Sequence, residues 1–174
     1  MQTKGQDKVS VYLSHPIRGH ATENIDEAIK KNNEIAKHYA GELRHWFPTV
    51  EFYVPAEHDD FPQAAMDLGM LSVDEVLAID VKIAGDCDVL LMLRPPEGAS
   101  EGQTYEWKNT YHACSSEVFD VAWTLDDRLS RDIILYLAWR LERISKTPLL
   151  QLSPMFQNKP SPQVPAVCWS GVYA

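Results

Sequence analysis

The stretch Cys87–Leu93, CDVLLML, decides the fold because its last five residues are all apolar. A strand with one face in water alternates apolar and polar residues, whereas a strand covered on both faces is apolar throughout. The following segment, RPPEGASEGQ (94–103), contains two prolines and two glycines, which end the strand and form a loop. The stretch therefore predicts a strand in the middle of a parallel sheet.

Strands and helices alternate on both sides of this stretch. Strands are expected at 9–14, 50–55 and 147–152, and helices at 22–46, 71–86, 102–114 and 126–145. Ser72 is the expected cap of the second helix, and Gly85 is expected just past its end. No repeat or linker divides the chain. The alternation predicts a single α/β domain over residues 1–174, with a doubly wound, mainly parallel sheet flanked by helices, of the Rossmann or flavodoxin type.

The composition restricts the class of function. The 174 residues carry a net charge of −9, which argues against a broad nucleic-acid surface or an anionic membrane as partner. A small phosphorylated ligand is compatible with this charge, because a few local donors can hold one phosphate. The three cysteines form no CxxC pair, there is no signal-peptide pattern, and no apolar run approaches ~18 residues. We therefore expect a soluble, cytoplasmic protein.

Two loops are expected at the carboxyl edge of the sheet, where ligands bind in such folds. The first, SHPIRGH (14–20), contains Arg18, whose planar guanidinium can bind two phosphate oxygens at once. The second, RPPEGASEGQ (94–103), opens a helix that carries Glu106, and its backbone N–H groups and Ser100 hydroxyl can bind an oxyanion. Glu106 is therefore a candidate nucleophile at an electrophilic carbon, or a base for water.

Glycosyl transfer suits a carboxylate in this position, because its oxocarbenium-like transition state commonly lies between two carboxyl groups. The second acid would be Asp80, on the helix before the apolar strand, or Asp88, at the start of that strand. Tyr12 lies near the carboxyl end of the first strand, where its hydroxyl could orient a carboxylate. Ordinary structural explanations stay open for all of them: an exposed helix residue for Glu106 and Asp80, a core tyrosine for Tyr12, and a surface ion pair for Arg18.

Two further groups of residues have side chains that can bind a metal or react. His58, Asp59 and Asp60 could suggest metal ligands, but no other His or carboxylate follows at a metal-binding spacing, which favours a solvated loop. Cys114 has no identifiable activating base and is expected to be structural. We therefore expect neither a metal nor a cofactor.

Four segments, taken in order, resemble the nucleoside 2-deoxyribosyltransferase superfamily, and in particular its nucleoside 5'-monophosphate N-glycosidase branch. VYLSHPIRG (11–19) is similar to the first strand and phosphate-side loop of that family. IDVKIAGDCDVLLML (79–93) is similar to its acidic helix leading into an apolar strand. SEGQTYE (100–106) is similar to the motif that ends in the nucleophilic glutamate, and CWSGVYA (168–174) to the aromatic tail that closes the sugar site in some transferases.

The resemblance implies a role for each matched residue. Glu106 would attack the anomeric carbon of the sugar, Tyr12 would orient it, and Asp80 would assist departure of the base or hold the sugar. Asp88, eight residues after Asp80 as in the family pattern, would contact the substrate. His58 would do the same, since a similar segment lies near the base pocket of relatives.

The resemblance also implies a binding region for the 5' end of the ligand. Ser100 and Gly102 would lie there beside Arg18 and Gly19, and His15, in place of a common glycine, would border the substrate. Transferases acting on free nucleosides typically have an acid at position 100, whereas the monophosphate hydrolases have serine there and an arginine in the first loop. An acid repels a phosphate, while serine and arginine attract one. The pair therefore favours a nucleoside 5'-monophosphate.

The resemblance thus implies a nucleoside deoxyribosyltransferase-like domain that hydrolyses the N-glycosidic bond of a (deoxy)nucleoside 5'-monophosphate. The products would be the free base and (deoxy)ribose 5-phosphate. A nucleoside 2-deoxyribosyltransferase, which passes the sugar to a second base, and a nucleotide-binding sensor without turnover remain alternatives. Subunits of this family commonly complete each other's sites, which implies a homodimer or larger homo-oligomer.

The chain departs from the family pattern after the helix that carries Glu106. About forty residues separate Glu106 from KTPLLQL (146–152), so a helical insertion is expected at about 115–146. The apolar face of its helix would supply either core or a subunit interface. Glu117, within this stretch, is a weaker alternative nucleophile.

Overall fold

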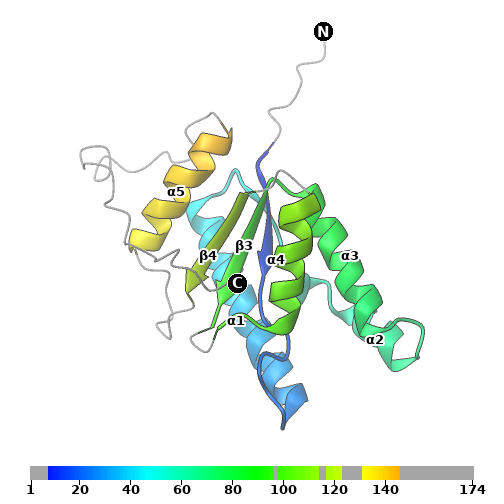
Figure 1. The fold of residues 1–174 in the computed structure, drawn as a ribbon. Coiled ribbons are helices and arrows are strands. Elements are labelled where there is room, and N and C mark those ends of the chain that lie inside the picture. Colours follow the sequence, from blue (N-terminus) through cyan, green and yellow to red (C-terminus); the bar gives the residue numbers. More distant parts are fainter. Residues whose placement is uncertain (1–7, 96–97, 114–116, 123–130, 146–174) are drawn as a thin grey trace.

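The computed structural model describes residues 8–95, 98–113, 117–122 and 131–145, and these form an α/β fold with a parallel sheet flanked by helices (Figure 1). Three strands have the order β2-β1-β3, and a fourth strand, β4, extends the sheet beyond β3. The strands are β1 (Ser10–Ser14), β2 (Glu51–Tyr53), β3 (Val89–Arg94) and β4 (Glu117–Ala122). The apolar stretch is β3, which has a strand on each side and is buried from Val89 to Leu93 as predicted.

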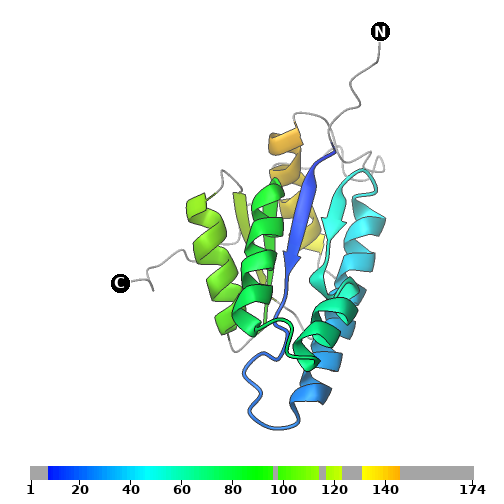
Figure 2. The ribbon, with the colours of Figure 1, turned by 90° about the vertical axis from the view of Figure 1, so that its right-hand side faces the viewer.

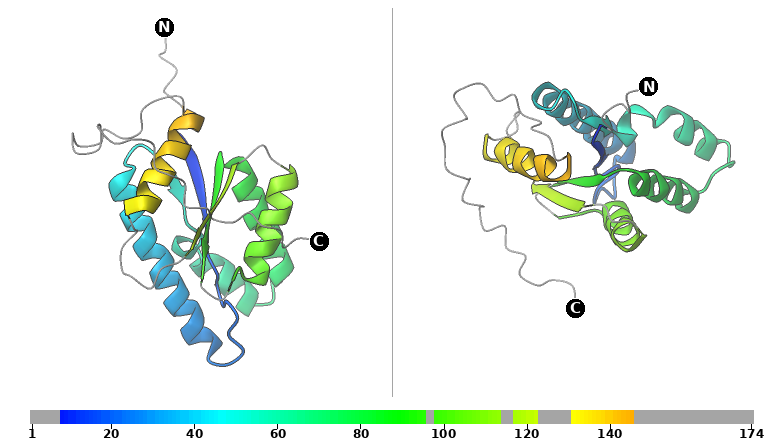
Figure 3. Two further views of the ribbon diagram at one scale, coloured as in Figure 1. Left: turned by 60° about the vertical axis from the view of Figure 1, so that its left-hand side comes forward. Right: turned by 90° about the horizontal axis from the view of Figure 1, so that it is seen from above.

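Helices cover both faces of the sheet (Figure 3). The helices are α1 (Ile25–Trp46), α2 (Asp60–Asp67), α3 (Val73–Asp86), α4 (Glu101–Ala113) and α5 (Arg131–Ser145), with a 3₁₀ turn η1 (Pro55–Glu57). One apolar cluster joins α1 and α5 to residues such as Val11 and Leu91, and a second joins α3 and α4 to Tyr12 and Leu90. None of the helices in these described parts is both long and apolar enough to cross a membrane.

The strand order places a topological switch point at β1. From β1 the chain moves to β2 on one side, and from β2 it crosses to β3 on the other side of β1. Consecutive crossovers on opposite sides of a strand open a crevice at the carboxyl ends, where ligands of α/β proteins bind. Figure 2 shows that the loop after β1, the beginning of α4 and helix α2 gather at this end.

Two helix boundaries differ from the sequence prediction. Helix α1 begins at Ile25 rather than at residue 22, after Asn24, which has a left-handed backbone (φ 49°). The Ser72 cap of α3 is present and forms a reciprocal capping box with Glu75. Gly85, expected past the end of α3, lies within its last turn instead, because the helix ends at Asp86 and the following Cys87 has an extended backbone that needs no glycine.

Part of the stretch 115–146, where a helical insertion is expected, forms a strand instead. Residues Glu117–Ala122 form β4, which pairs in parallel with the whole of β3 and is therefore part of the sheet. Helix α5 belongs to the core rather than standing apart from it, since Leu137 and Leu141 are almost fully buried in the larger cluster. The strand expected at 147–152, the start of the helix expected from 126, Cys114 and the aromatic tail at 168–174 lie outside the described residues.

Candidate active site

The alternation of β1 separates an apolar face from a hydroxyl face. Val11 and Leu13 point into the larger core under α1, whereas Ser10, Tyr12 and Ser14 point to the face covered by α3 and α4. Successive residues of a strand alternate between faces, so this SxYxS pattern puts three hydroxyl groups in a row. Tyr12 and Ser14 are fully buried near the carboxyl end of the strand.

Glu106 is the residue that these hydroxyls hold. It projects from α4 and is only 5% exposed. Its Oε1 accepts a hydrogen bond from the Tyr12 hydroxyl at 3.0 Å, and its Oε2 accepts one from the Ser14 hydroxyl at 2.5 Å. Both oxygens of the carboxyl group are therefore fixed by donors from one strand, as is typical of a preorganised functional group rather than of a solvated helix residue.

Asp80 lies in the same environment. It projects from α3, is 8% exposed, and is close enough to both Tyr12 and Glu106 to change their pKa values. Burial, with the charge of Asp80 as a further cause, raises the pKa of Glu106 to about 7, although the Ser14 and Tyr12 hydroxyls oppose the rise. Burial and the charge of Asp59 raise the pKa of Asp80 to about 6. Two neighbouring carboxyl groups with raised pKa values readily keep one proton between them near neutral pH.

An aromatic stack continues from this pair toward β2. Tyr12 pairs with Tyr53 across the two strands, and their rings stack with centroids 5.6 Å apart. The ring of His58 also stacks on Tyr53, with ring centroids 4.8 Å apart. A bidentate ion pair between Arg44 of α1 and Glu57, with distances of 2.6 and 2.7 Å, fixes the η1 turn that precedes His58. The stack therefore offers a supported aromatic surface next to the carboxyl pair.

The beginning of α4 carries the residues expected near a phosphate. Ser100 and Gln103 form a reciprocal capping box, in which the Ser100 hydroxyl accepts from the Gln103 N–H at 3.2 Å. Ser100 is thus first a helix cap, and its hydroxyl keeps its own hydrogen to donate. Gln103, which is 1% exposed, also donates to the Leu93 carbonyl at 2.8 Å and ties this turn to β3.

Arg18 reaches the same turn from the loop after β1. Its guanidinium lies 4.0 Å from the Glu101 carboxylate, and both side chains are largely exposed. Such an exposed pair contributes little to stability, so the guanidinium can leave it for a stronger partner. Gly19, beside Arg18, has φ +61°, and an added Cβ would meet the Asn32 side chain at 3.5 Å.

The remaining glycine predicted near the ligand lies in the first turn of α4. An added Cβ at Gly102 would meet a side-chain carbon of Leu77 at 3.6 Å and the Ser100 hydroxyl at 3.9 Å. Both are ordinary van der Waals distances, so Gly102 is here a residue of the contact between α3 and α4. With Ser100 and Arg18 it places three of the predicted phosphate-side residues at one end of α4.

His15 also lies at this edge, whereas Asp88 does not. His15 directly follows β1, is 4% exposed, and its Nε2 hydrogen-bonds to Asn33. Asp88 precedes β3 and accepts hydrogen bonds from the N–H and the hydroxyl of Ser10, both at 2.8 Å. Asp88 is therefore at the amino end of the strands, opposite to Glu106. The same end holds Glu117, which pairs with Val89 at the start of β3.

Several site residues were not singled out from the sequence. Ser14 was recognisable, because its spacing of two from Tyr12 puts both on one face of the strand. Tyr53 was less so, because its contact with Tyr12 depends on the register between β1 and β2. Asn33 lies on the polar side of α1, and nothing in its local sequence indicates its contacts with His15 and Asp59.

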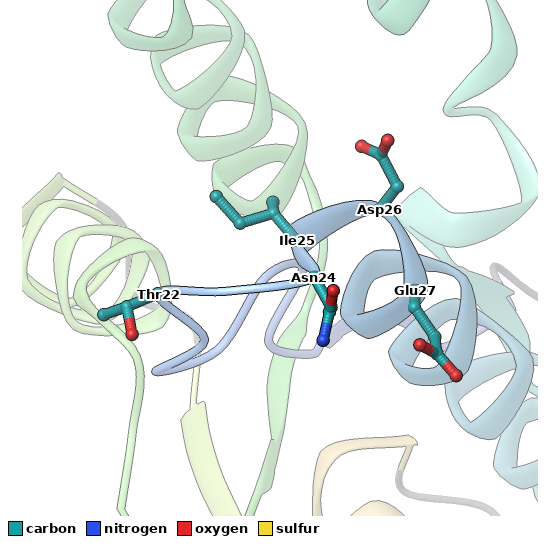
Figure 4. Close-up of a pocket in the computed structure, with 5 residues that line it drawn as sticks. All are labelled: Thr22, Asn24, Ile25, Asp26 and Glu27. Carbon is teal, nitrogen blue, oxygen red and sulfur yellow. The ribbon is translucent and has the colours of Figure 1, made fainter.

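A hollow elsewhere on the molecule does not form a comparable site. It lies at the beginning of α1 and is lined by Thr22 and the residues from Asn24 to Glu27. Figure 4 shows that their side chains diverge rather than converge on one point. Among the residues that the structure describes, no three His, Cys, Asp or Glu side chains are grouped to hold a metal ion.

Comparison with protein-family models, with curated proteins and with solved structures finds no match to this chain. The arrangement combines a buried, doubly hydrogen-bonded glutamate, a buried aspartate beside it and an aromatic stack. A helix N-terminus with a nearby arginine lies at the same edge of the sheet.

Proposed function

We propose that this protein hydrolyses the N-glycosidic bond of a (deoxy)nucleoside 5'-monophosphate with Glu106 as nucleophile. The observation that carries the proposal is the buried Glu106 carboxyl group, held through both oxygens by Tyr12 and Ser14, with Asp80 beside it. Together with the motif resemblance, this supports a nucleoside deoxyribosyltransferase-like domain of the doubly wound type. A homo-oligomer in the cytoplasm is part of the same proposal.

In the proposed reaction Glu106 is the nucleophile, and Asp80 is the general acid and then the general base. A Glu106 oxygen attacks the anomeric carbon and forms a glycosyl ester, while the bond from that carbon to the base nitrogen breaks. The electron pair of that bond goes to the base, which takes a proton from Asp80. Water then attacks the same carbon, gives a proton to Asp80 and releases the Glu106 carboxylate with the sugar phosphate. The hydroxyls of Tyr12 and Ser14 favour the negative charge on Glu106, but burial still raises its pKa to about 7, above the value of about 6 for Asp80. The positive charge that develops on the sugar then favours the form in which Asp80 carries the shared proton and Glu106 is ionised.

The residues at the beginning of α4 favour a substrate with a 5'-phosphate over one with a free 5'-hydroxyl. Helix N-termini attract anions through their exposed N–H groups and dipole. Arg18 lies at this turn, and its contact with the exposed Glu101 is weak enough to be exchanged for a phosphate. No carboxylate occupies position 100, where one would repel the phosphate.

A substrate panel tests the function directly. Nucleosides and their 5'-monophosphates, in ribo and deoxy form, are incubated with and without an acceptor base, and chromatography follows free base and new nucleosides. Base release from monophosphates without an acceptor is the expected result. Product only in the presence of an acceptor would establish the 2-deoxyribosyltransferase alternative instead. Binding of a nucleotide with no product in either case would contradict catalysis and leave a sensor.

Removal of the Ser14 or Tyr12 hydroxyl is expected to shift the pH dependence of kcat/KM. In Ser14→Ala the Glu106 carboxylate loses one hydrogen bond, so its pKa rises, and the ascending limb of kcat/KM against pH moves to higher pH. Activity at pH 7 should fall about 10–100-fold, the value of one hydrogen bond to a charged group. Tyr12→Phe should act in the same direction. Tyr105→Phe, an exposed tyrosine next to Glu106, is the matched control. An unshifted limb in both variants would contradict the proposed role of Glu106.

Arg18→Ala is expected to separate phosphate binding from chemistry. The variant should lose about 10–100-fold in kcat/KM for monophosphates, as one charge-assisted contact is removed, and nothing for free nucleosides. Steady-state kinetics with matched nucleoside and monophosphate pairs measures both. Lys30→Ala, an exposed cation on α1, controls for the change of net charge. An equal loss for both substrates would place Arg18 outside the phosphate site.

A further inference from the structure

The side chain of Asp59 does not cap the helix that it precedes. It occupies the N-cap position of α2, where aspartate is strongly preferred because it accepts from the N–H groups of the first turn. The Asp59 side chain makes no such bond. Its Oδ2 instead accepts from the Asn33 amide nitrogen at 2.9 Å, across to α1. The residue is half-buried, whereas its neighbour Asp60 is exposed.

A directional hydrogen-bond chain holds Asp59 in this orientation. Asn33 donates to Asp59 through Nδ2, so its Oδ1 faces the Nε2 of His15 at 3.0 Å. An amide oxygen can only accept, and the proton of His15 therefore lies on Nε2. Burial lowers the pKa of His15, which keeps the ring neutral. The buried end of β1 thus fixes Asp59 through Asn33.

The carboxylate held in this way belongs to the edge that carries the candidate active site. Asp59 directly follows His58, whose ring ends the stack of Tyr12, Tyr53 and His58. Burial is the main reason that the pKa values of Asp80 and Tyr53 are raised, and the negative charge of Asp59 adds to both, as expected for a group on their side of the sheet. Only Oδ2 has a partner among the described residues, and Oδ1 is left to accept a hydrogen bond. An aromatic surface and an oriented acceptor therefore adjoin the pair that would cleave the bond.

We propose that Asp59 is a specificity-determining residue that selects a nucleobase bearing an exocyclic amino group. The inference rests on the proposed function, since it names the substrates of that site. A carboxylate accepts hydrogen bonds and cannot donate them, so it pairs with an amino group and repels the lone pairs of an oxo group. Adenine and cytosine fit this requirement, whereas hypoxanthine and uracil place an oxygen at the same position. Asn33 is then a positioning residue, acting through Asp59.

Matched nucleotides that differ in this one group test the proposal. The initial rates of AMP and IMP, and of CMP and UMP, are compared in ribo and deoxy form, and their dissociation constants are measured by calorimetry. At least one pair should favour the amino base by about tenfold or more, in line with the discrimination that one good base contact supplies. Asp59→Asn should bring that ratio close to one, because an amide can donate to an oxo group. Asp60→Asn, the exposed neighbour, should keep the wild-type ratio.

Asn33→Ala tests the positioning role. It should lower the same ratio without abolishing turnover, an effect that general loss of stability does not produce. Equal rates for amino and oxo bases in the wild-type protein would overturn the inference and leave the hydrolase intact. Amino-selective binding that Asp59→Asn removes, in a protein that cleaves nothing, would support the inference and overturn the hydrolase. Absence of both selectivity and turnover would overturn both.

Discussion

Glu106→Gln is expected to reduce base release from a nucleoside 5'-monophosphate by about a thousandfold or more, because the amide cannot form the glycosyl ester. The change is nearly isosteric and keeps the Tyr12 and Ser14 hydroxyls close to a polar acceptor. Nucleotide binding should therefore persist while turnover is lost. Single-turnover assays with chromatographic detection of the base, together with calorimetric binding, measure the two separately.

A matched variant shows whether the loss is specific to this carboxyl group. Glu34→Gln removes an exposed glutamate of α1 and should leave the rate unchanged. Retention of more than a tenth of the activity in Glu106→Gln would rule out the nucleophile and with it the covalent route. Loss of nucleotide binding along with turnover would instead point to a binding role for Glu106.

Stability is expected to fall as pH rises from about 5 to 8, because Glu106 must ionise while buried. Its folded-state pKa of about 7 lies above the ordinary value of 4.5. A carboxyl group with a raised pKa binds more protons in the folded state, so its contribution is present at low pH and is lost as the pH rises through this interval. For Glu106 the loss amounts to about 3 kcal/mol, and Asp80 adds to it in the same direction.

Reversible urea unfolding of the wild type and Glu106→Gln at pH 5 and pH 8 measures this effect. The variant should be more stable than the wild type at pH 8 by about 2–3 kcal/mol, and this advantage should largely vanish at pH 5. Asp86→Asn, an exposed residue of α3, should show no such dependence. A stability difference that is the same at both pH values would mean that Glu106 is not held in a desolvated state. A site that costs stability in this way is common where function needs a buried polar group.

Local patterns predicted most of the framework. The apolar run of β3, the helix expected at 22–46 and the Ser72 cap each depend on residues close in sequence, and all three are present, with α1 beginning at Ile25. Strand β4 was not predicted because EVFDVA (117–122) is short. It also lies within the stretch where the motif resemblance implies a helical insertion. Its strand character depends on pairing with β3, which no local signal reveals.

Some contacts of the candidate site could likewise be predicted from the sequence, and others could not. The contact between Tyr12 and Glu106 was anticipated from motif resemblance, and Ser14 follows from the period of a strand. The chain from His15 through Asn33 to Asp59 joins three segments that only the packing of α1 against the sheet brings together. Asp88 was expected at the substrate because its spacing fits a motif, although spacing along the chain does not tell which end of a strand faces a ligand.

The position of Asp88 suits a role in the alignment of the strands. Its hydrogen bonds with Ser10 join the first residue of β1 to the residue before β3, at the end of the sheet remote from Glu106. If β1 slid by a single residue along β3, Tyr12 and Ser14 would turn toward α1, and Val11 and Leu13 would face the glutamate. The hydrogen bonds between Asp88 and Ser10 therefore favour the register that turns Tyr12 and Ser14 toward Glu106.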